Sequence, residues 1–236
     1  MTLGIMQPYI FPYIGYFQLI NAVDTFVFYD DVNFIKGGWI NRNRILVNNK
    51  DFMFTISLKN MSSFSLIKET LICEKKFQKN NLKFLKTIEQ SYKNAPYFET
   101  IFPLLYNFLI TTKALTISEL AMNSIVLVSG YLNLKTKFKT SSLDFNKTKG
   151  LDKAERIIAI SKIEKAIHYI NPIGGEMLYN KKQFVAEGIE ISFLKSKPIT
   201  YQQFNNQFTP WLSIIDVLMF NSKEQVLDIL NEYNLI

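Results

Sequence analysis

Cysteine and histidine are almost absent from this sequence, which contains one of each in 236 residues. A single cysteine, Cys73, excludes an intramolecular disulfide and a cysteine-rich metal site, and it is typical of a protein from a reducing compartment. A single histidine, His168, leaves neither a histidine-rich metal site nor a convincing Ser/His/Asp arrangement. We therefore expect no dedicated metal-binding set of side chains.

Several signatures of cofactor binding and membrane insertion are also missing. The sequence has no P-loop and no complete Gly-x-Gly-x-x-Gly. No apolar run approaches the ~20 residues that span a bilayer, and no basic segment of the signal-peptide kind precedes the first apolar run. We expect a cytoplasmic protein without membrane insertion. Its net charge of +7 leaves anionic small molecules, lipids and nucleic acids open as partners.

The opening residues predict a strand, a loop, a helix and a second strand. Residues 3–6 are apolar, residues 13–22 have apolar positions suited to a helix, and residues 25–29 are β-branched and aromatic. This order is that of a parallel unit, whose first loop lies at the carboxyl end of its strand, where α/β proteins bind ligands. The sequence thus predicts a single α/β domain over residues 1–236, with a Rossmann-like parallel sheet.

The middle of the chain changes to a helical period. Residues 74–92, 97–111 and 117–130 each have the apolar spacing of a helix, and they predict a helical insertion, or subdomain, at about 74–131. We also expect a hairpin at 45–47 and 52–57, short strands at 67–73, 134–140 and 165–170, a final strand at 189–194, and a buried helix that begins at Pro210.

The segment after the second strand has the composition of a phosphate- or sugar-binding loop. Guanidinium groups bind phosphate in a bidentate manner, and a tryptophan ring stacks on bases or sugars. The other interpretation is a solvated basic hairpin, which accounts for the charges and leaves the tryptophan and two glycines unexplained. The expected contacts are Lys36, Trp39, Asn41, Arg42, Asn43 and Arg44.

Gly15 lies in the first turn of the first predicted helix, where a glycine costs up to about 1 kcal/mol relative to alanine. Such a glycine either lets a ligand approach the helix amino terminus or packs against the first strand. Both interpretations stay open on the sequence alone.

Three acidic residues are candidates for chemistry. Asp30 and Asp31 follow the second strand, where they would orient an amine or hydroxyl, hold Mg²⁺, or merely be solvated turn residues. Asp216 lies in an apolar helical pattern, so its carboxylate needs a partner; a structural pair with an arginine of the first hairpin and a catalytic role are both open. Polar residues at 141–144 and 171–175 follow two further strands, and Asn171 is added to the candidate contacts.

Three long motifs resemble one known family. They are IMQPYIFPYIGYFQLI at 5–20 with YDD at 29–31, GGWINRNR at 37–44, and LSIIDVLMFN at 212–221. On these motifs, together with NPIGG at 171–175, the chain is identified as a member of the WbqC-like family. The resemblance implies a role in bacterial O-antigen (lipopolysaccharide) or capsule gene clusters, as an enzyme that forms an amide or transfers an acyl or aminoacyl group, such as glycine, to a nucleotide-linked amino-sugar.

A weaker resemblance concerns the first loop. The stretch PYIGY at 12–16 occupies the place of the His-x-Gly-His signature of nucleotidylyltransferases and pantothenate synthetase, but both histidines are replaced, by Tyr13 and Tyr16. Tyrosines can donate hydrogen bonds to phosphate but carry no imidazolium charge, which puts adenylate chemistry in doubt.

Two functions follow from this sequence. In the first, the protein is a transferase or ligase in which Asp30 or Asp31 takes the proton of an attacking amine, and its partners are a nucleotide-linked sugar and a small acyl or aminoacyl donor. In the second, it is a non-catalytic protein that binds a sugar nucleotide or RNA. No pattern identifies a cofactor, the use of ATP, or the oligomeric state. The remaining expected contacts are Gln7, Tyr9, Tyr13, Gly15, Tyr16, Asn171 and Asp216.

Overall fold

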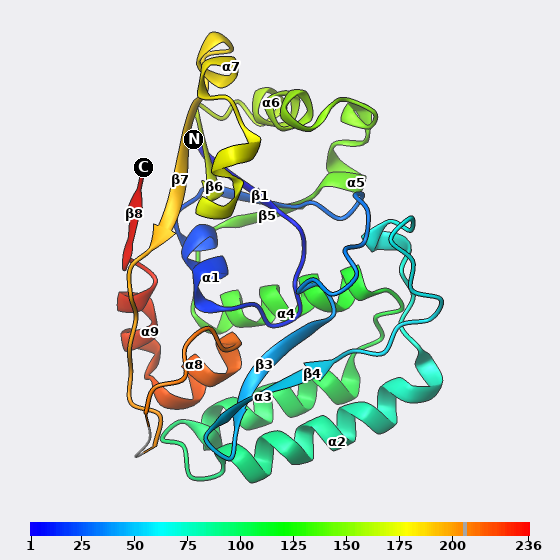
Figure 1. Ribbon diagram of the computed structural model, residues 1–236, viewed down its shortest axis with the longest axis vertical. Helices are drawn as coiled ribbons and strands as arrows, with labels where there is room; N and C mark the ends of the chain where they lie inside the picture. Colours follow the sequence, from blue (N-terminus) through cyan, green and yellow to red (C-terminus); the bar gives the residue numbers. More distant parts are fainter. Residues whose placement is uncertain (205–206) are drawn as a thin grey trace.

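A six-stranded, mostly parallel sheet forms the centre of the protein (Figure 1). The computed structural model describes residues 1–204 and 207–236. The strand order is β5-β2-β1-β6-β7-β8, and only β8 runs antiparallel to its neighbour. The strands are β1 (Thr2–Met6), β2 (Thr25–Phe28), β5 (Lys137–Thr140), β6 (His168–Pro172), β7 (Glu190–Ser196) and β8 (Tyr233–Leu235).

Both faces of the sheet are buried, as a parallel sheet requires. Along β2, Val27 belongs to one buried cluster and its neighbours Phe26 and Phe28 belong to the other. The same alternation places Tyr169 of β6 on the first face and Ile170 on the second. The Rossmann-like α/β fold predicted from the sequence is confirmed.

Helices cover each face. The first face packs against α6 (Lys153–Ile163) and α7 (Lys181–Ala186), and the second against α1 (Ile14–Asn21). The three helices expected between residues 74 and 131 are α2 (Glu74–Tyr92), α3 (Phe98–Thr111) and α4 (Ile117–Tyr131), drawn below the sheet in Figure 1. The others are α5 (Ser141–Asp144), α8 (Ile214–Phe220), α9 (Lys223–Ile229) and the 3₁₀ helices η1 (Ile67–Glu69), η2 (Asn146–Thr148) and η3 (Ile173–Leu178).

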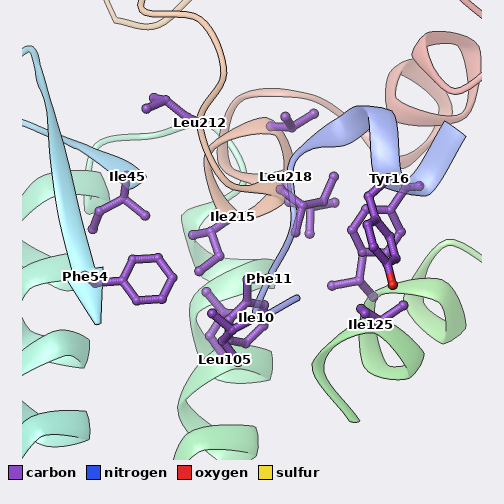
Figure 2. Packing of buried hydrophobic residues seen from close by; sticks show 14 of the residues in the cluster. Ile10, Phe11, Tyr16, Ile45, Phe54, Leu105, Ile125, Leu212, Ile215 and Leu218 are labelled. Carbon is purple, nitrogen blue, oxygen red and sulfur yellow. The ribbon is translucent and has the colours of Figure 1, made fainter. Parts of the chain in front are cut away.

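The predicted hairpin forms a separate two-stranded sheet of β3 (Arg42–Val47) and β4 (Lys50–Thr55). Asn48 and Asn49 connect the strands with φ values of 50° and 62°, as in a two-residue hairpin turn. Figure 2 shows how the hairpin is anchored: Ile45 and Phe54 lie in one cluster with residues of the first loop, α3 and α8. Thus the packing of the hairpin holds β3 beside the first loop, although the two segments are separated in the sequence by α1 and β2.

Three expectations about secondary structure are wrong. Residues 67–73 form η1 and two isolated bridges, because Leu71 and Ile72 pair with Thr116 and Leu58 instead of a sheet strand. Strand β7 is not the last strand, since β8 adds to its edge. Helix α8 begins at Ile214, not at Pro210.

The late start of α8 has a clear cause. The backbone N–H of Ser213 donates to the carbonyl of Arg44 at 2.8 Å, and that of Ile214 donates to the carbonyl of Pro12, also at 2.8 Å. These bonds fix Ser213 as the non-helical residue that precedes the helix. As a result, the first loop, β3 and the segment before α8 meet at one place.

Candidate functional site

The order of the strands reverses next to β1. The chain proceeds from β1 to β2 and β5 on one side and to β6 and β7 on the other. In open α/β sheets, ligands bind at the carboxyl ends of the two strands that flank such a reversal. In this protein these ends are Met6 of β1 and Pro172 of β6.

A cavity of about 420 Å³, here called the first cavity, opens at that point. Its volume is within the range of small-molecule sites, about 300–1,000 Å³. A larger cavity of about 770 Å³ lies beside Thr2 and Thr25, at the opposite ends of the strands. The first cavity is lined by Met6, Tyr9, Pro12, Tyr13, Trp39, Asn43, Arg44, Pro172, Ile173, Gly174 and Trp211.

Arg44 supplies the positive charge of the first cavity. Its guanidinium lies 5.5 Å from the ring centre of Trp39, pairs with Asp51 at 3.1 Å and donates to the carbonyl of Trp211 at 3.3 Å. Its Nε is buried and finds no partner in the described part of the chain. Buried donors are normally satisfied, so the guanidinium of Arg44 lacks a full set of partners within the described part of the chain.

The loop that carries Trp39 is fixed by Arg42. The Arg42 guanidinium donates to the carbonyls of Gly37 and Gly38 and lies 6.0 Å from the Trp39 ring centre. Arg42 is therefore occupied in shaping the loop, while Arg44 faces the cavity. A ring flanked by two guanidiniums presents a rigid plate for stacking.

Tyr13 lies directly against the backbone of Gly15. A Cβ atom at position 15 would stand 2.4 and 2.8 Å from two ring atoms of Tyr13 and 2.9 Å from Oγ of Ser196. Burial raises the pKa of Tyr13, so its hydroxyl stays protonated at neutral pH and can donate a hydrogen bond. The close approach anticipated at Gly15 is thus made by a side chain that lines the cavity.

Replacing Gly15 with alanine is expected to displace the Tyr13 ring. The free energy of unfolding should fall by about 0–2 kcal/mol, because the gain in helix propensity of about 1 kcal/mol offsets only part of the cost of overpacking, about 1–3 kcal/mol. Ligand binding at the first cavity should weaken as well, since the Tyr13 ring lines it. Thermal unfolding with and without ligand tests this, and Gly130→Ala, where a Cβ meets nothing within 4 Å, is the matched control.

Asp30 and Asp31 lie in a second polar cluster, at the ends of β2 and β5. Ser142 donates to Asp30 through its backbone N–H at 3.0 Å and its hydroxyl at 2.7 Å. Ser141 Oγ lies 3.0 Å from Asp30 Oδ1 and 2.5 Å from Asp31 Oδ1, so its one proton serves one carboxylate at a time. Arg156 pairs with Asp31 at 2.6 Å.

The chain is similar to known proteins over almost its whole length. Residues 7–228 match the WbqC-like protein family. The chain belongs to this family. An uncharacterized protein of Mycobacterium tuberculosis, Rv1507c, is 27% identical to this WbqC-like protein over 220 residues, which are 92% of each chain. No solved structure matches the chain at a significant level.

Several residues expected to bind substrate in this WbqC-like protein line the first cavity, and others support it. Tyr9, Tyr13, Trp39, Asn43 and Arg44 line it. The buried hydroxyl of Tyr16 donates to the carbonyl of Gln7 at 2.9 Å, and this bond fixes the backbone at the start of the first loop.

The remaining candidates lie behind or outside the cavity lining. Asn41 is buried and donates to the carbonyl of Ile56 at 2.9 Å. Asn171 packs on Gly175, where a Cβ would be 1.9 Å from its Nδ2. Lys36 is exposed and absent from the lining residues.

Asp216 is bound by neutral donors and not by an arginine. Its buried carboxylate accepts hydrogen bonds from Tyr92 at 2.8 Å, Tyr201 at 2.6 Å and Gln203 at 2.7 Å. The suggested pairing with a hairpin arginine is wrong, because Arg44 pairs with Asp51 instead.

The structure adds lining residues that the motifs did not single out, above all Trp211 and the residues 172–174. Trp211 is 64% exposed and has a φ of 61°, which is unusual for a bulky residue. In the sequence, Pro210 predicts only a helix start. The adjacent Pro-Trp pair at 210–211 is the one sequence signal that could have pointed to this position.

Within residues 1–204 and 207–236, no group of three or more His, Cys, Asp or Glu side chains is placed so as to hold a metal ion. No helix of this part of the chain is long and apolar enough to cross a membrane.

Proposed function

We propose that the first cavity binds a nucleotide-linked amino-sugar and that the protein transfers an acyl or aminoacyl group to its amine. The observation that supports binding is the combination of a strand-order reversal with tyrosine and tryptophan rings and one arginine. Aromatic faces stack on sugars and bases, and a guanidinium binds phosphate. The transfer half of the proposal depends on the role that the WbqC-like resemblance implies, in surface-polysaccharide biosynthesis.

The residues have distinct tasks in this proposal. Trp39 and Tyr9 provide stacking surfaces, Arg44 contacts a phosphate, and the protonated Tyr13 hydroxyl donates a hydrogen bond. Asp30 or Asp31 as the proton acceptor stays a prediction. Both carboxylates lie outside the lining of the first cavity and already accept hydrogen bonds, so they would have to act through a rearrangement.

Replacing Arg44 with glutamine should weaken sugar-nucleotide binding. A hydrogen bond to a charged group contributes about 1.5–3 kcal/mol, which corresponds to roughly 10- to 100-fold in affinity. Calorimetric titration of UDP- and dTDP-linked amino-sugars measures this effect. Asp51→Asn is the control, because it breaks the exposed Arg44 ion pair and keeps the cation; its affinity should be unchanged or higher.

Mass spectrometry then separates the two functions. The bound amino-sugar nucleotide is incubated with acyl-CoAs, or with amino acids and ATP, and a mass increase of the sugar marks transfer. Binding without any such product would assign the protein to the non-catalytic class. Unchanged affinity in Arg44→Gln would exclude the first cavity as the site.

A further inference from the structure

A second cavity of about 420 Å³ adjoins the first. The two share Tyr13 and Trp211, whose ring centres are 6.1 Å apart. The other lining residues of the second cavity include Ile14, Lys195, Lys197, Ile199, Phe208 and Val217. A pair of aromatic side chains is therefore the wall between two small-molecule cavities.

The wall is tied to both sides. Arg44 of the first cavity donates to the carbonyl of Trp211, and Tyr13 rests on Gly15 close to Ser196 of the second cavity. Trp211 holds its left-handed backbone conformation in this position. Strained backbone of this kind is concentrated at ligand-binding sites, because the surrounding contacts must compensate its cost.

The second cavity combines apolar walls with positive charge. Ile14, Ile199, Phe208 and Val217 are among its apolar side chains. Its positive charge comes from Lys195, near the end of β7, and Lys197, just after β7. Lys197 pairs with Glu232, whereas Lys195 forms no ion pair in the described ranges. No acidic residue is among the described lining residues of either cavity.

We propose that the second cavity binds the acyl chain of a thioester donor with an anionic carrier, so that the thioester carbonyl lies at the edge of the Tyr13–Trp211 wall, where the two cavities adjoin and the amine of the sugar nucleotide can reach it. This inference rests on the proposed function and selects between its two donor classes. An apolar chain fits the walls, and Lys195 complements a phosphate of the carrier. The ammonium group of a free amino acid would find no carboxylate in either lining, so an aminoacyl donor is disfavoured.

The transfer step balances without an additional reagent. The amine nitrogen of the sugar attacks the thioester carbonyl, an N–C bond forms and the C–S bond breaks. The electron pair of the C–S bond leaves with sulfur, and the proton lost by the nitrogen ends on that thiolate. The products are an amide and a free thiol.

Titration calorimetry with octanoyl-CoA tests the second cavity directly. Ile199→Glu places a carboxylate against the acyl chain, and Lys195→Glu reverses the charge that faces the carrier. Each should weaken octanoyl-CoA binding by roughly 10-fold or more. Lys79→Glu, an exposed position on α2 outside both linings, makes the same charge change and should bind as the wild type does.

The same samples are titrated with the amino-sugar nucleotide. Retained sugar-nucleotide binding with lost octanoyl-CoA binding, in variants with wild-type circular dichroism, supports the proposal. Three results would overturn it. The first is that octanoyl-CoA does not bind the wild type, and the second is that both cavity variants bind octanoyl-CoA as tightly as the wild type does. The third is that the protein binds glycine and Ile199→Glu abolishes that binding. If the wild type binds octanoyl-CoA but not the amino-sugar nucleotide, the proposed function is refuted instead. The experiment thus distinguishes failure of this inference from failure of the proposed function.

Discussion

Replacing Arg156 with alanine is expected to lower the free energy of unfolding by about 3–5 kcal/mol, the usual cost of removing one partner of a buried ion pair. The side chains of Arg156 and Asp31 are only 6% and 1% exposed, and they pair at 2.6 Å. Arg156 also bonds Thr148 Oγ1 at 3.2 Å and lies 4.9 Å from the Tyr29 ring centre. Its removal leaves the Asp31 carboxylate buried without its cation.

Urea unfolding monitored by circular dichroism measures this loss. Lys162→Ala is the matched control, because the Lys162–Glu187 pair is about half exposed, and such pairs contribute about 0–1 kcal/mol. The double variant Asp31→Asn with Arg156→Met removes both charges and should recover much of the stability. Equal losses in Arg156→Ala and Lys162→Ala would contradict the assignment of Asp31–Arg156 as a structural pair.

The contribution of Asp31 should also depend on pH. Burial alone would raise its pKa, but hydrogen bonds from Arg156 and Ser141 and the arginine charge outweigh burial and leave the pKa lowered. A lowered folded-state pKa means that the unfolded state binds more protons in the acidic range. The stabilisation is therefore complete above the unfolded pKa of about 3.9 and is lost as the pH falls toward the folded value. The stability difference between wild type and Asp31→Asn should shrink below about pH 4.

Local patterns predicted the elements that local forces determine. Helix α2 begins and ends at Glu74 and Tyr92, as its apolar spacing indicated. Helix α4 begins one residue after Thr116, a residue type favoured at helix caps, whose hydroxyl accepts from the backbone N–H of Glu119. Strands β1 and β2 followed from their apolar runs and adjacent turn signals. These signals depend on neighbours within a few residues, and a single sequence contains them in full.

Contacts between distant segments could not be predicted in the same way. Arg156 and Asp31 are 125 positions apart, and Arg44 and Trp211 are 167 apart. Strand β8 has three residues, too few for a period, and exists because its backbone pairs with the edge of β7. The candidate contacts therefore included the loop and the hairpin that line the first cavity, but not the lining side chains that come from elsewhere in the chain.

Replacing Asp216 with alanine is the second substitution expected to have a large effect. The carboxylate joins three segments: Tyr92 of α2, which itself accepts from the N–H of Leu46 in β3, and Tyr201 and Gln203 before α8. Each buried donor left unsatisfied costs about 1–3 kcal/mol, and relief of the buried charge offsets part of the sum. We expect a loss of about 3 kcal/mol or more in urea unfolding.

Asp216→Asn distinguishes the lost hydrogen bonds from the lost charge. Burial raises the pKa of Asp216, and the bonds from Tyr201, Tyr92 and Gln203 only partly oppose it. The folded state thus binds more protons than the unfolded state above about pH 3.9, so this residue's contribution to stability falls as the pH rises through the folded pKa. Asparagine does not titrate. Relative to Asp216→Asn, the wild type should therefore lose stability as the pH rises from 4 toward neutral, whereas relative to Asp31→Asn it should gain stability as the pH rises through about 4. Opposite pH dependence of the two buried aspartates would show that Arg156 stabilises the charged form of Asp31. It would also show that the neutral donors around Asp216 do not fully compensate the burial of its charge. The same sign for both would refute this difference between their environments.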